Sequence, residues 1–278
     1  MKLTTFLRWA GGKVNSVDRL SSFVPKDYYE GTYWEPFLGG GSMFFALSPP
    51  HAVLSDLNSH LIHCFKMVRD YPEIIYNYIR EFSKSDSEAT YYKIRMEYNK
   101  SKPTIKQAAQ FIYLNKTSYN GIFRVNRNGE YNVPYGRKEN PAFPSLEHLG
   151  RISTALKKTE LRTSSFEDIE KDIKRRDFIY LDPPYPPLNG TSYFTHYTKE
   201  RFGGNEQIKV SDFANRLIDM DCRVMISNAD TPFIRNLYKS WNIRILPVTR
   251  WITCKSKRHK VNELIITNYW IFLKIKLR

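Results

Sequence analysis

Residues 182–185, Asp-Pro-Pro-Tyr, can hold an amino group that projects from a flat ring. They directly follow an apolar run, residues 178–181, which predicts a buried strand. Prolines fix φ and remove backbone donors, so the carbonyl oxygens of Asp182 and Pro183 stay available as acceptors. Asp182 and the Pro183 carbonyl can accept two N–H bonds while Tyr185 stacks on the ring. Alone, the same four residues are also typical of a strand followed by a turn.

A second candidate site is a run of glycines between a strand-like and a helix-like segment. The apolar sequence around residues 34–38 is followed by Gly39, Gly40 and Gly41, and then by an apolar run. Glycines let a ligand approach the backbone closely because no Cβ intervenes. The spacing differs from the GxGxxG dinucleotide fingerprint, and no Lys-Ser/Thr pair follows as in a phosphate loop. We therefore expect a ligand packed on bare backbone rather than a phosphate cradle.

Two further segments carry groups that suit a polar ligand. Asp56 ends the next strand-like run, about 20 residues after the first one begins, where an acid commonly binds a ribose diol. A helix cap or an exposed turn is the alternative for Asp56. Residues 8–13, Arg-Trp-Ala-Gly-Gly-Lys, combine a ring, two glycines and a cation. Lys13 can pair with a ligand carboxylate, and Trp9 can pack against the aliphatic part of the ligand.

Apolar runs separated by helical or turn segments predict an α/β fold with an open sheet. The runs are residues 32–37, 51–56, 159–165, 178–182, 223–228, 243–248 and 263–270. Ligands of open α/β sheets bind outside the carboxyl ends of the strands. The polar residues at these ends are Glu35, Asp56, Asp182 and Ser227-Asn228. We expect one shared site there, although strand ends are also polar where a chain simply exits to solvent.

Residues 59–149 have a different pattern. Apolar residues recur at helical spacing through residues 60–115, and residues 116–144 are turn-rich and basic. We predict a mainly helical lobe that ends in a basic, hairpin-like segment. The lobe would be inserted between residues 1–58 and 150–278, which together would form the α/β domain.

Composition narrows the class of partner. The chain has 43 Lys and Arg residues against 28 Asp and Glu, a formal charge of +15, which favours a nucleic acid over a membrane surface. Its three cysteines, Cys64, Cys222 and Cys254, form no CxxC pair, so we predict neither a disulfide framework nor a metal site. The chain begins with no signal-peptide pattern, and its apolar C-terminal stretch is too short for a membrane span. We expect a soluble protein of a reducing compartment.

Several motifs, taken in their order along the chain, resemble the DNA adenine-N6 methyltransferases of the Dam type, the α class. They are WAGGK (9–13), EPFLGGGS (35–42), SDLN (55–58), SF (165–166), DPPY (182–185) and SN (227–228). The resemblance runs from about residue 5 to residue 268, and the set of motifs is jointly very specific. It implies a Rossmann-like methyltransferase fold with a mixed sheet, in which residues 59–149 are the target-recognition domain. It also implies methyl transfer to adenine N6 in double-stranded DNA, after the adenine flips out of the duplex.

The resemblance also implies a cofactor and a set of catalytic residues. The cofactor would be S-adenosylmethionine, released as S-adenosylhomocysteine, with no metal. Phe37 and Phe166 would flank its adenine, and the glycine run would lie beside its methionine part. Its contacts would be Trp9, Ala10, Gly11, Lys13, Glu35, Phe37, Gly39, Gly40, Gly41, Asp56, Phe166 and Asp182. The catalytic residues would be Asp182, Pro183, Pro184 and Tyr185.

The segment from residue 115 to residue 137 is similar to the recognition hairpin of the family. The implied DNA contacts are Arg8, Asn115, Lys116, Tyr119, Asn120, Ile122, Arg124, Pro134 and Arg137. Arg124 would read a guanine edge, and Tyr119 and Asn120 would fill or border the gap left by the flipped adenine. The likeness favours GATC, or another site that contains GAT. Arg8 stands where the family often has lysine, a departure that bears on recognition of the first base. For the basic residues, a solvated face that binds phosphates is the alternative.

Two segments and three rival functions complete the expectations. We predict that residues 187–204 form a loop that orders over substrate and cofactor. Residues 250–260 are predicted either to contact phosphates or to form a solvated charged loop.

Three other functions are alternatives to DNA adenine methylation. They are methylation of RNA adenine, methylation of a protein amide, and DNA binding without activity. Related amide methyltransferases have Asn in place of Asp182, the hairpin disfavours RNA, and the intact Lys13 and Asp56 argue against an inactive protein. We expect a monomer in the cytoplasm of a bacterial or phage-infected cell, associated with the nucleoid.

Overall fold

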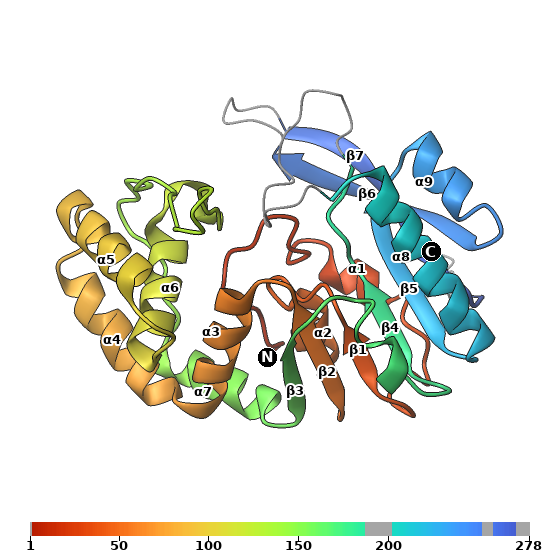
Figure 1. Ribbon diagram of the computed structural model, residues 1–278, viewed down its shortest axis with the longest axis horizontal. Coiled ribbons are helices and arrows are strands. Elements are labelled where there is room, and N and C mark those ends of the chain that lie inside the picture. Colours follow the sequence, from red (N-terminus) through yellow and green to blue (C-terminus); the bar gives the residue numbers. More distant parts are fainter. Residues whose placement is uncertain (1, 187–201, 252–257, 271–278) are drawn as a thin grey trace, which may run out of the picture.

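The computed structural model describes residues 2–186, 202–251 and 258–270, which form a seven-stranded mixed sheet covered by helices (Figure 1). The strands are β1 (Tyr33–Glu35), β2 (Ala52–Asp56), β3 (Thr159–Thr163), β4 (Phe178–Leu181), β5 (Arg223–Ala229), β6 (Asn242–Trp251) and β7 (Arg258–Thr267). Their order is β3-β2-β1-β4-β5-β7-β6, with β7 antiparallel to both of its neighbours. The predicted α/β fold with a mixed sheet is confirmed.

The strand order reverses between β1 and β4. The chain runs outward from β1 to β2 and β3, and then returns to place β4 on the other side of β1, followed by β5. Such a reversal is the point at which open α/β sheets bind ligands. Glu35 ends β1 and Asp182 directly follows β4, so both acids lie at the reversal. Because β1, β2, β4 and β5 are parallel, the predicted polar strand ends do share one edge.

Alternate residues of the central strands face two different cores, as the two-residue period of a strand requires. Tyr33, Leu54 and Tyr180 belong to the core beneath α1 (Val17–Ser21), α2 (Ser42–Leu47), α3 (Ser59–Asp70) and α7 (Leu146–Leu156). The other core holds Trp34 and Ile179 beneath α8 (Gly204–Asp219) and α9 (Pro232–Leu237). The sheet is thus covered on both faces, which fixes the positions of its strand ends.

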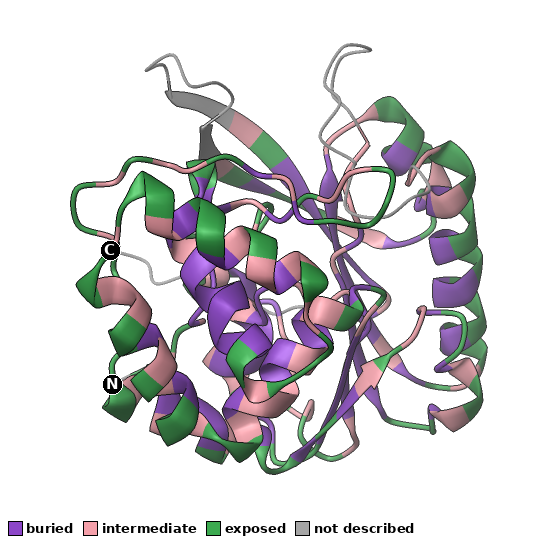
Figure 2. Ribbon diagram, turned by 60° about the vertical axis from the view of Figure 1, so that its left-hand side comes forward, coloured by how far each residue is buried: buried purple, intermediate pink, exposed green. Residues whose placement is uncertain are grey.

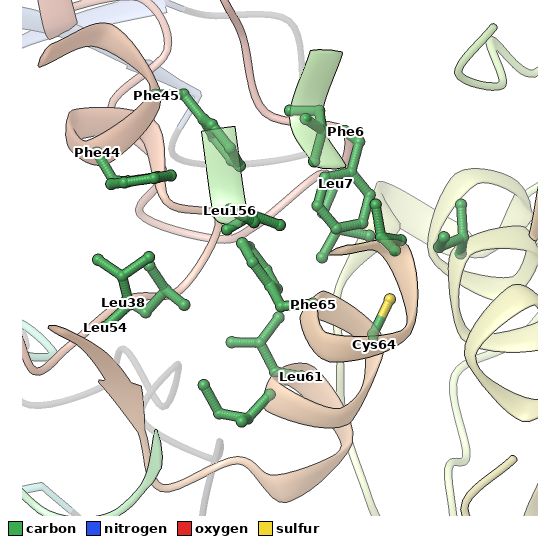
Figure 3. Packing of buried hydrophobic residues seen from close by; sticks show 14 of the residues in the cluster. Phe6, Leu7, Leu38, Phe44, Phe45, Leu54, Leu61, Cys64, Phe65 and Leu156 are labelled. Carbon is green, nitrogen blue, oxygen red and sulfur yellow. The ribbon is translucent and has the colours of Figure 1, made fainter. Parts of the chain in front are cut away.

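The first of these cores is built largely from aromatic and leucine side chains. Figure 3 shows Phe45 of α2, Phe65 of α3 and Leu156 of α7 packed close to one another. The rings of Phe45 and Phe65 are stacked, with centroids 6.2 Å apart. This packing holds α2, which follows the glycine run, against α3 and α7, the helices that lead into and out of the lobe.

The predicted helical lobe is present beside the sheet. It contains α3, α4 (Pro72–Lys84), α5 (Glu88–Lys100) and α6 (Ile105–Thr117). In Figure 2 these helices come forward, with buried residues where they face one another and exposed residues on the outside. α3 packs on α6 as well as on β2 and β3, so lobe and sheet share one continuous core. The division at residues 59 and 149 stays a prediction.

The segment after α6 is hairpin-like, as predicted, but it has little regular structure. A short 3-10 turn, Tyr119–Gly121, comes first. Two isolated bridges then join Ser118 to Tyr135 and Val125 to Tyr131. Side chains of α5 also hold its backbone, since Arg95 donates to the Val133 carbonyl and Asn99 donates to the Tyr131 carbonyl.

For residues 250–260, the alternative of a charged loop is wrong for the part that the structure describes, and phosphate contact stays a prediction. β6 and β7 form a long antiparallel hairpin, and Arg250 pairs with His259 at its end. The charged sequence did not predict that β6 and β7 continue into this region. Backbone pairing between the two strands, rather than apolar side chains, extends them here. Residues 252–257, with Cys254, lie outside the described residues, as do residues 187–201 of the predicted loop. Cys64 and Cys222 are buried free thiols. None of the described helices is long and apolar enough to cross a membrane.

Candidate active site

A buried ion pair lies at the centre of the candidate site. The Lys13 Nζ lies 2.7 Å and 2.6 Å from the two carboxylate oxygens of Asp182, and it also donates to the Gly11 carbonyl at 3.0 Å. The Lys13 side chain is 5% exposed and that of Asp182 is 18% exposed. Burial raises the pKa of Asp182 above its usual value, and the charge of Lys13 opposes that rise. The N-terminal arm and the end of β4, which are distant in sequence, thus meet here, although the predicted partner of Lys13 was a ligand carboxylate rather than Asp182.

Tyr185 joins this pair and brings in two residues that the sequence did not suggest. The Lys13 Nζ lies 4.8 Å from the centroid of the Tyr185 ring, within cation–π range. The Tyr185 hydroxyl donates to Glu263 Oε2 at 3.2 Å. The Pro184 carbonyl accepts from Gln207 Nε2 at 2.8 Å. The Asp-Pro-Pro-Tyr segment is therefore contacted from the N-terminal arm, from β7 and from α8.

Glu35 lies buried at the end of β1, next to the ion pair. It is 3% exposed, and its Oε2 accepts from the Tyr33 hydroxyl at 2.7 Å and from the Phe44 N–H at 3.1 Å. Burial raises the pKa of Glu35 to about 8, and the negative charge of Asp182 adds to that rise. The hydrogen bond from Tyr33 and the charge of Lys13 oppose it. At neutral pH the Glu35 carboxyl is therefore largely protonated in the folded protein.

The glycine run forms a turn that contacts two predicted site residues, Trp9 and Asp56. Gly39 has φ +46°, and a Cβ there would lie 2.7 Å from a ring atom of Trp9, so the position requires glycine. The Gly39 N–H donates to Asp56 Oδ2 at 3.0 Å, while the Asn58 N–H donates to Asp56 Oδ1 at 2.9 Å. Burial raises the pKa of Asp56, and these two bonds oppose the rise. Gly41, with φ +68°, then caps α2.

Phe37 and Phe166 contact each other directly. Their ring centroids are 5.4 Å apart, with an interplanar angle of 31°. A ring inserted between them would need about 7 Å, twice the stacking distance that dispersion contacts favour. A flat group can therefore lie along one face of the pair, or between the rings once one of them moves.

The N-terminal arm also contacts the recognition segment. Asn115, at the end of α6, is 3% exposed. Its amide accepts from the Arg8 N–H at 2.8 Å and donates to the Arg8 carbonyl at 2.7 Å and the Gly121 carbonyl at 3.1 Å. Gly121 has φ +64°, and a Cβ there would meet the Arg8 side chain at 2.9 Å. Asn115 was expected to contact DNA, but the structure shows it buried and bonded to backbone.

Most of the other predicted recognition residues lie exposed on the hairpin-like segment. Tyr119 is 43% exposed, and its N–H donates to the Pro134 carbonyl at 2.9 Å. Arg124 is exposed, and its Nε donates to Asn132 Oδ1 at 2.8 Å. Asn120 and Pro134 are exposed as well, whereas Ile122 is half-buried. Arg137 is exposed and pairs with Glu88 at 3.0 Å.

A group of cations lies where the arm meets this segment. Burial lowers the pKa of Lys116 to about 8, and the charge of Arg8 lowers it further. Lys138 donates to the Lys116 carbonyl, and its pKa is also lowered to about 8, by burial and then by Arg8 and Lys116. Positive groups held this close favour an anion beside them.

Two buried polar residues were missed by the sequence reasoning, Gln207 and Glu263. Gln207 lies on the inner face of α8 with Val210, Ala214 and Leu217, where helical spacing predicts an apolar residue. Glu263 precedes the apolar run Leu-Ile-Ile of β7 and is 4% exposed. A polar residue on an otherwise apolar face was the available signal in both places.

Three features define an enzyme with a Rossmann-like methyltransferase fold: the order of the strands, the turn at Gly39, and the acid that follows β4. Comparison with known sequences gives the family. Residues 9–258 match the sequence profile of the D12 class N6 adenine-specific DNA methyltransferases, and the chain belongs to this family. Among the described residues, no three His, Cys, Asp or Glu side chains are grouped so that they could hold a metal ion.

Three relatives illustrate the family. A type II methyltransferase of Methanocaldococcus jannaschii, M.MjaIII, is 38% identical over 97% of this chain and 100% of its own. The type II methyltransferase M1.LlaDCHI of Lactococcus lactis is 35% identical over 97% of this chain and 96% of its own. The DNA adenine methylase of Escherichia coli is 33% identical over 95% of both chains. The protein is accordingly an adenine-specific DNA methyltransferase, which methylates adenine N6 in DNA.

Proposed function

We propose that this enzyme transfers a methyl group from S-adenosylmethionine to an adenine that has flipped out of double-stranded DNA, at GATC or another GAT-containing site. The observation that carries the proposal is the Asp182–Lys13 pair, buried beside Tyr185 at the reversal of strand order. It brings an acceptor, a cation and a stacking ring together where open α/β sheets bind ligands.

The groups at this edge of the sheet suit S-adenosylmethionine. The cofactor carries a reactive methyl group on a positively charged sulfonium, together with an adenine, a ribose diol and a methionine carboxylate. Asp56 offers oxygens to the diol, and Lys13 offers an ammonium to the carboxylate. The bare turn at Gly39 allows close approach of the methionine part. Ser42 Oγ and Ser55 Oγ, near this turn, are buried with no partner among the described residues, which supports a polar ligand there.

The catalytic residues hold the amino group of the target rather than forming a bond to it. Flipping the adenine costs roughly a few kcal/mol. Asp182 and the Pro183 carbonyl would accept the two N6–H bonds, which points the nitrogen lone pair toward the methyl group. Lys13 must give up one of the two Asp182 oxygens for this. A ligand carboxylate beside Lys13 would favour that exchange. Tyr185 would stack on the base, so that positioning and electrostatics do most of the work.

The exposed residues of the hairpin-like segment suit a duplex. Arg124 would read guanine through its bidentate fork. Tyr119 and Asn120 would border the gap in the duplex, with Ile122 and Pro134 against a thymine methyl. Arg8, Lys116 and Arg137 would contact DNA through their positive charges. Asn115 would act by joining the arm to the segment, since its amide is bonded to the backbone of both.

The test is methyl transfer from labelled S-adenosylmethionine to duplex DNA by the wild type and by Asp182→Asn. This variant keeps the shape of the side chain but removes the charge that pairs with Lys13. We expect turnover to fall by about 10³-fold or more while DNA is still retained. Asp18→Asn is the matched control, because Asp18 pairs with Lys2 in an exposed ion pair. Full activity of Asp182→Asn would contradict the proposed role.

The same assay separates the rival functions. Methylation of duplex DNA but not of RNA or protein favours the proposal, and no incorporation into any of them leaves an inactive DNA-binding protein. Mapping the methylated adenines then gives the recognition sequence. A monomer in the cytoplasm, associated with the nucleoid, is part of the proposal, and sedimentation of the purified protein tests the oligomeric state.

A further inference from the structure

We infer that Gln207 and Glu263 are positioning residues for Tyr185, which they hold at its backbone and at its hydroxyl. The inference deepens the proposed function and rests on it, because it concerns the ring on which the target base would stack. Gln207 reaches Tyr185 through the preceding carbonyl, and Glu263 reaches it from β7.

The first contact that positions Tyr185 is a buried chain of amide hydrogen bonds. Gln207 is 0% exposed, and its Nε2 donates to the Pro184 carbonyl at 2.8 Å. Its Oε1 accepts from Asn228 Nδ2 at 2.9 Å, and Asn228 Oδ1 accepts from the Ala229 N–H at 2.8 Å. The chain therefore connects α8 and the end of β5 to the peptide plane between Pro184 and Tyr185.

This chain fixes a peptide plane that has few other constraints. Two prolines remove backbone donors just before it, so a strand ladder cannot continue through this segment. A glutamine at a core-facing position of α8 costs free energy unless both ends of its amide are bonded. Here both ends are bonded, one to the Asp-Pro-Pro-Tyr segment and one to β5.

The second contact that positions Tyr185 comes from β7, the strand next to β5 in the sheet. Glu263 pairs with Ala229 across β5 and β7, so the antiparallel strand delivers its carboxyl to the same edge as the parallel strand ends. It is 4% exposed and accepts from the Tyr185 hydroxyl at 3.2 Å. The ring is thereby fixed at its outer end, beneath the Lys13 ammonium.

A ring held at both ends is prepared for stacking before the base arrives. Reactions that depend on alignment lose rate when a positioning contact loosens by a fraction of an ångström. Neither Gln207 nor Glu263 needs to touch the base or the methyl group. Loss of either hold should therefore lower kcat while the affinities for cofactor and DNA stay close to wild type.

The Glu263 hold is tested by a double-mutant cycle with Tyr185→Phe and Glu263→Leu. We expect Glu263→Leu to lose about 10-fold in kcat and Tyr185→Phe to lose at least as much, because the Tyr185 hydroxyl also bonds the Asp182 side chain. The double variant should lose no more than Tyr185→Phe alone, because both changes remove the bond between Tyr185 and Glu263. Glu263→Gln keeps an acceptor oxygen and should recover most of the rate. Losses that multiply to about 100-fold or more in the double variant would overturn the inference for Glu263.

A cycle on thermal unfolding of the same variants gives a readout that does not depend on turnover. Coupling between the two positions supports the hold even if wild type methylates no DNA, an outcome that would refute the proposed function alone. Additive effects on both stability and kcat would overturn the hold while the wild-type activity stood.

The Gln207 hold is tested by Gln207→Met, with Gln107→Met as the matched control. Gln107 is also a buried glutamine, 4% exposed, and donates to the Tyr98 and Ser101 carbonyls at the α5–α6 turn. We expect similar losses of stability but a kcat about 10-fold lower only for Gln207→Met. Equal kcat values for the two variants would overturn the inference for Gln207.

Discussion

The catalytic edge of the sheet and the hairpin-like recognition segment are held in opposite ways. At the catalytic edge the functional side chains themselves are buried and bonded, as the Asp182–Lys13 pair shows. In the recognition segment the functional side chains are exposed, and the backbone is bonded instead. Arg95 and Asn99 of α5 reach the carbonyls of Val133 and Tyr131, while Arg124 projects outward.

Because of this difference, mutations in the two regions should have different effects. A change at the catalytic edge alters a buried charge or hydrogen bond, so stability and chemistry change together. A change among the exposed side chains of the hairpin-like segment should leave the fold intact, and under the proposed function it should alter the choice of DNA sequence.

The largest effect is expected from Lys13→Met, which leaves the Asp182 carboxyl buried without its cation. Removing one partner of a buried pair costs about 3–5 kcal/mol of stability, and the pKa of Asp182 should rise further. We expect turnover to fall by about 10³-fold, measured with labelled cofactor, together with a lower melting temperature.

The matched control for this change is Lys2→Met, which removes an ion pair whose side chains are 67% and 68% exposed. Exposed pairs contribute at most about 1 kcal/mol. If both variants kept wild-type turnover and stability, the contrast between a buried and an exposed pair would fail for this protein.

The next effect concerns pH and Glu35. Burial raises its pKa from 4.5 to about 8, so the folded protein keeps a proton that the unfolded chain loses. The stability from this group is complete below the unfolded value and is lost as pH rises toward the folded value. Between about pH 5 and pH 7 wild type should lose about 3 kcal/mol relative to Glu35→Gln, at about 1.4 kcal/mol per pH unit.

Denaturant unfolding of wild type and of Glu35→Gln across this pH range measures the difference in their free energies of unfolding. Contributions from the other titrating groups cancel in this difference. Parallel curves would show that Glu35 titrates alike in the folded and unfolded states.

Much of the catalytic edge was predictable from local sequence. Strands that end in acids, and glycines that follow a strand, are patterns of neighbouring residues, and parallel pairing brings their ends together. The meeting of Lys13 with Asp182 was expected only through the family, because no local rule joins positions 169 residues apart.

The remaining parts depend on contacts between segments that are distant in sequence. Glu263 reaches the site because β7 runs antiparallel beside β5, and nothing in its own strand indicates the register. The β6–β7 hairpin extends into a charged run because cross-strand bonds outweigh polarity there. Asn115 was predicted to contact DNA as part of the segment from residue 115 to residue 137, yet its side chain is buried and bonded to the backbone of Arg8 and Gly121.

A smaller and more selective effect is expected from Arg124→Ala. Loss of a bidentate contact to guanine costs about 1–3 kcal/mol, or about 5- to 150-fold in kcat/KM, and relaxes the choice of base at one position. Arg127→Ala on the same segment should weaken all sequences alike and reduce the salt dependence of binding by about one charge. Methylation rates on a panel of duplexes that differ at one base measure both. An Arg124→Ala enzyme with unchanged sequence preference would assign Arg124 to phosphate contact.

The smallest effect tests whether the recognition segment is held through its backbone. Asn99 bonds Tyr131 twice: its Nδ2 donates to the carbonyl at 3.0 Å, and its Oδ1 accepts from the N–H at 2.9 Å. Asn99→Ala should cost about 1–2 kcal/mol of stability, since each bond contributes roughly 1 kcal/mol. DNA affinity should fall a few-fold, measured by fluorescence anisotropy. Cofactor affinity measured by calorimetry should stay unchanged, because Asn99 bonds Tyr131 in the hairpin-like segment rather than the catalytic edge. A parallel loss of cofactor affinity would mean that the two regions move as one unit, and the contrast between them would then describe only their exposure.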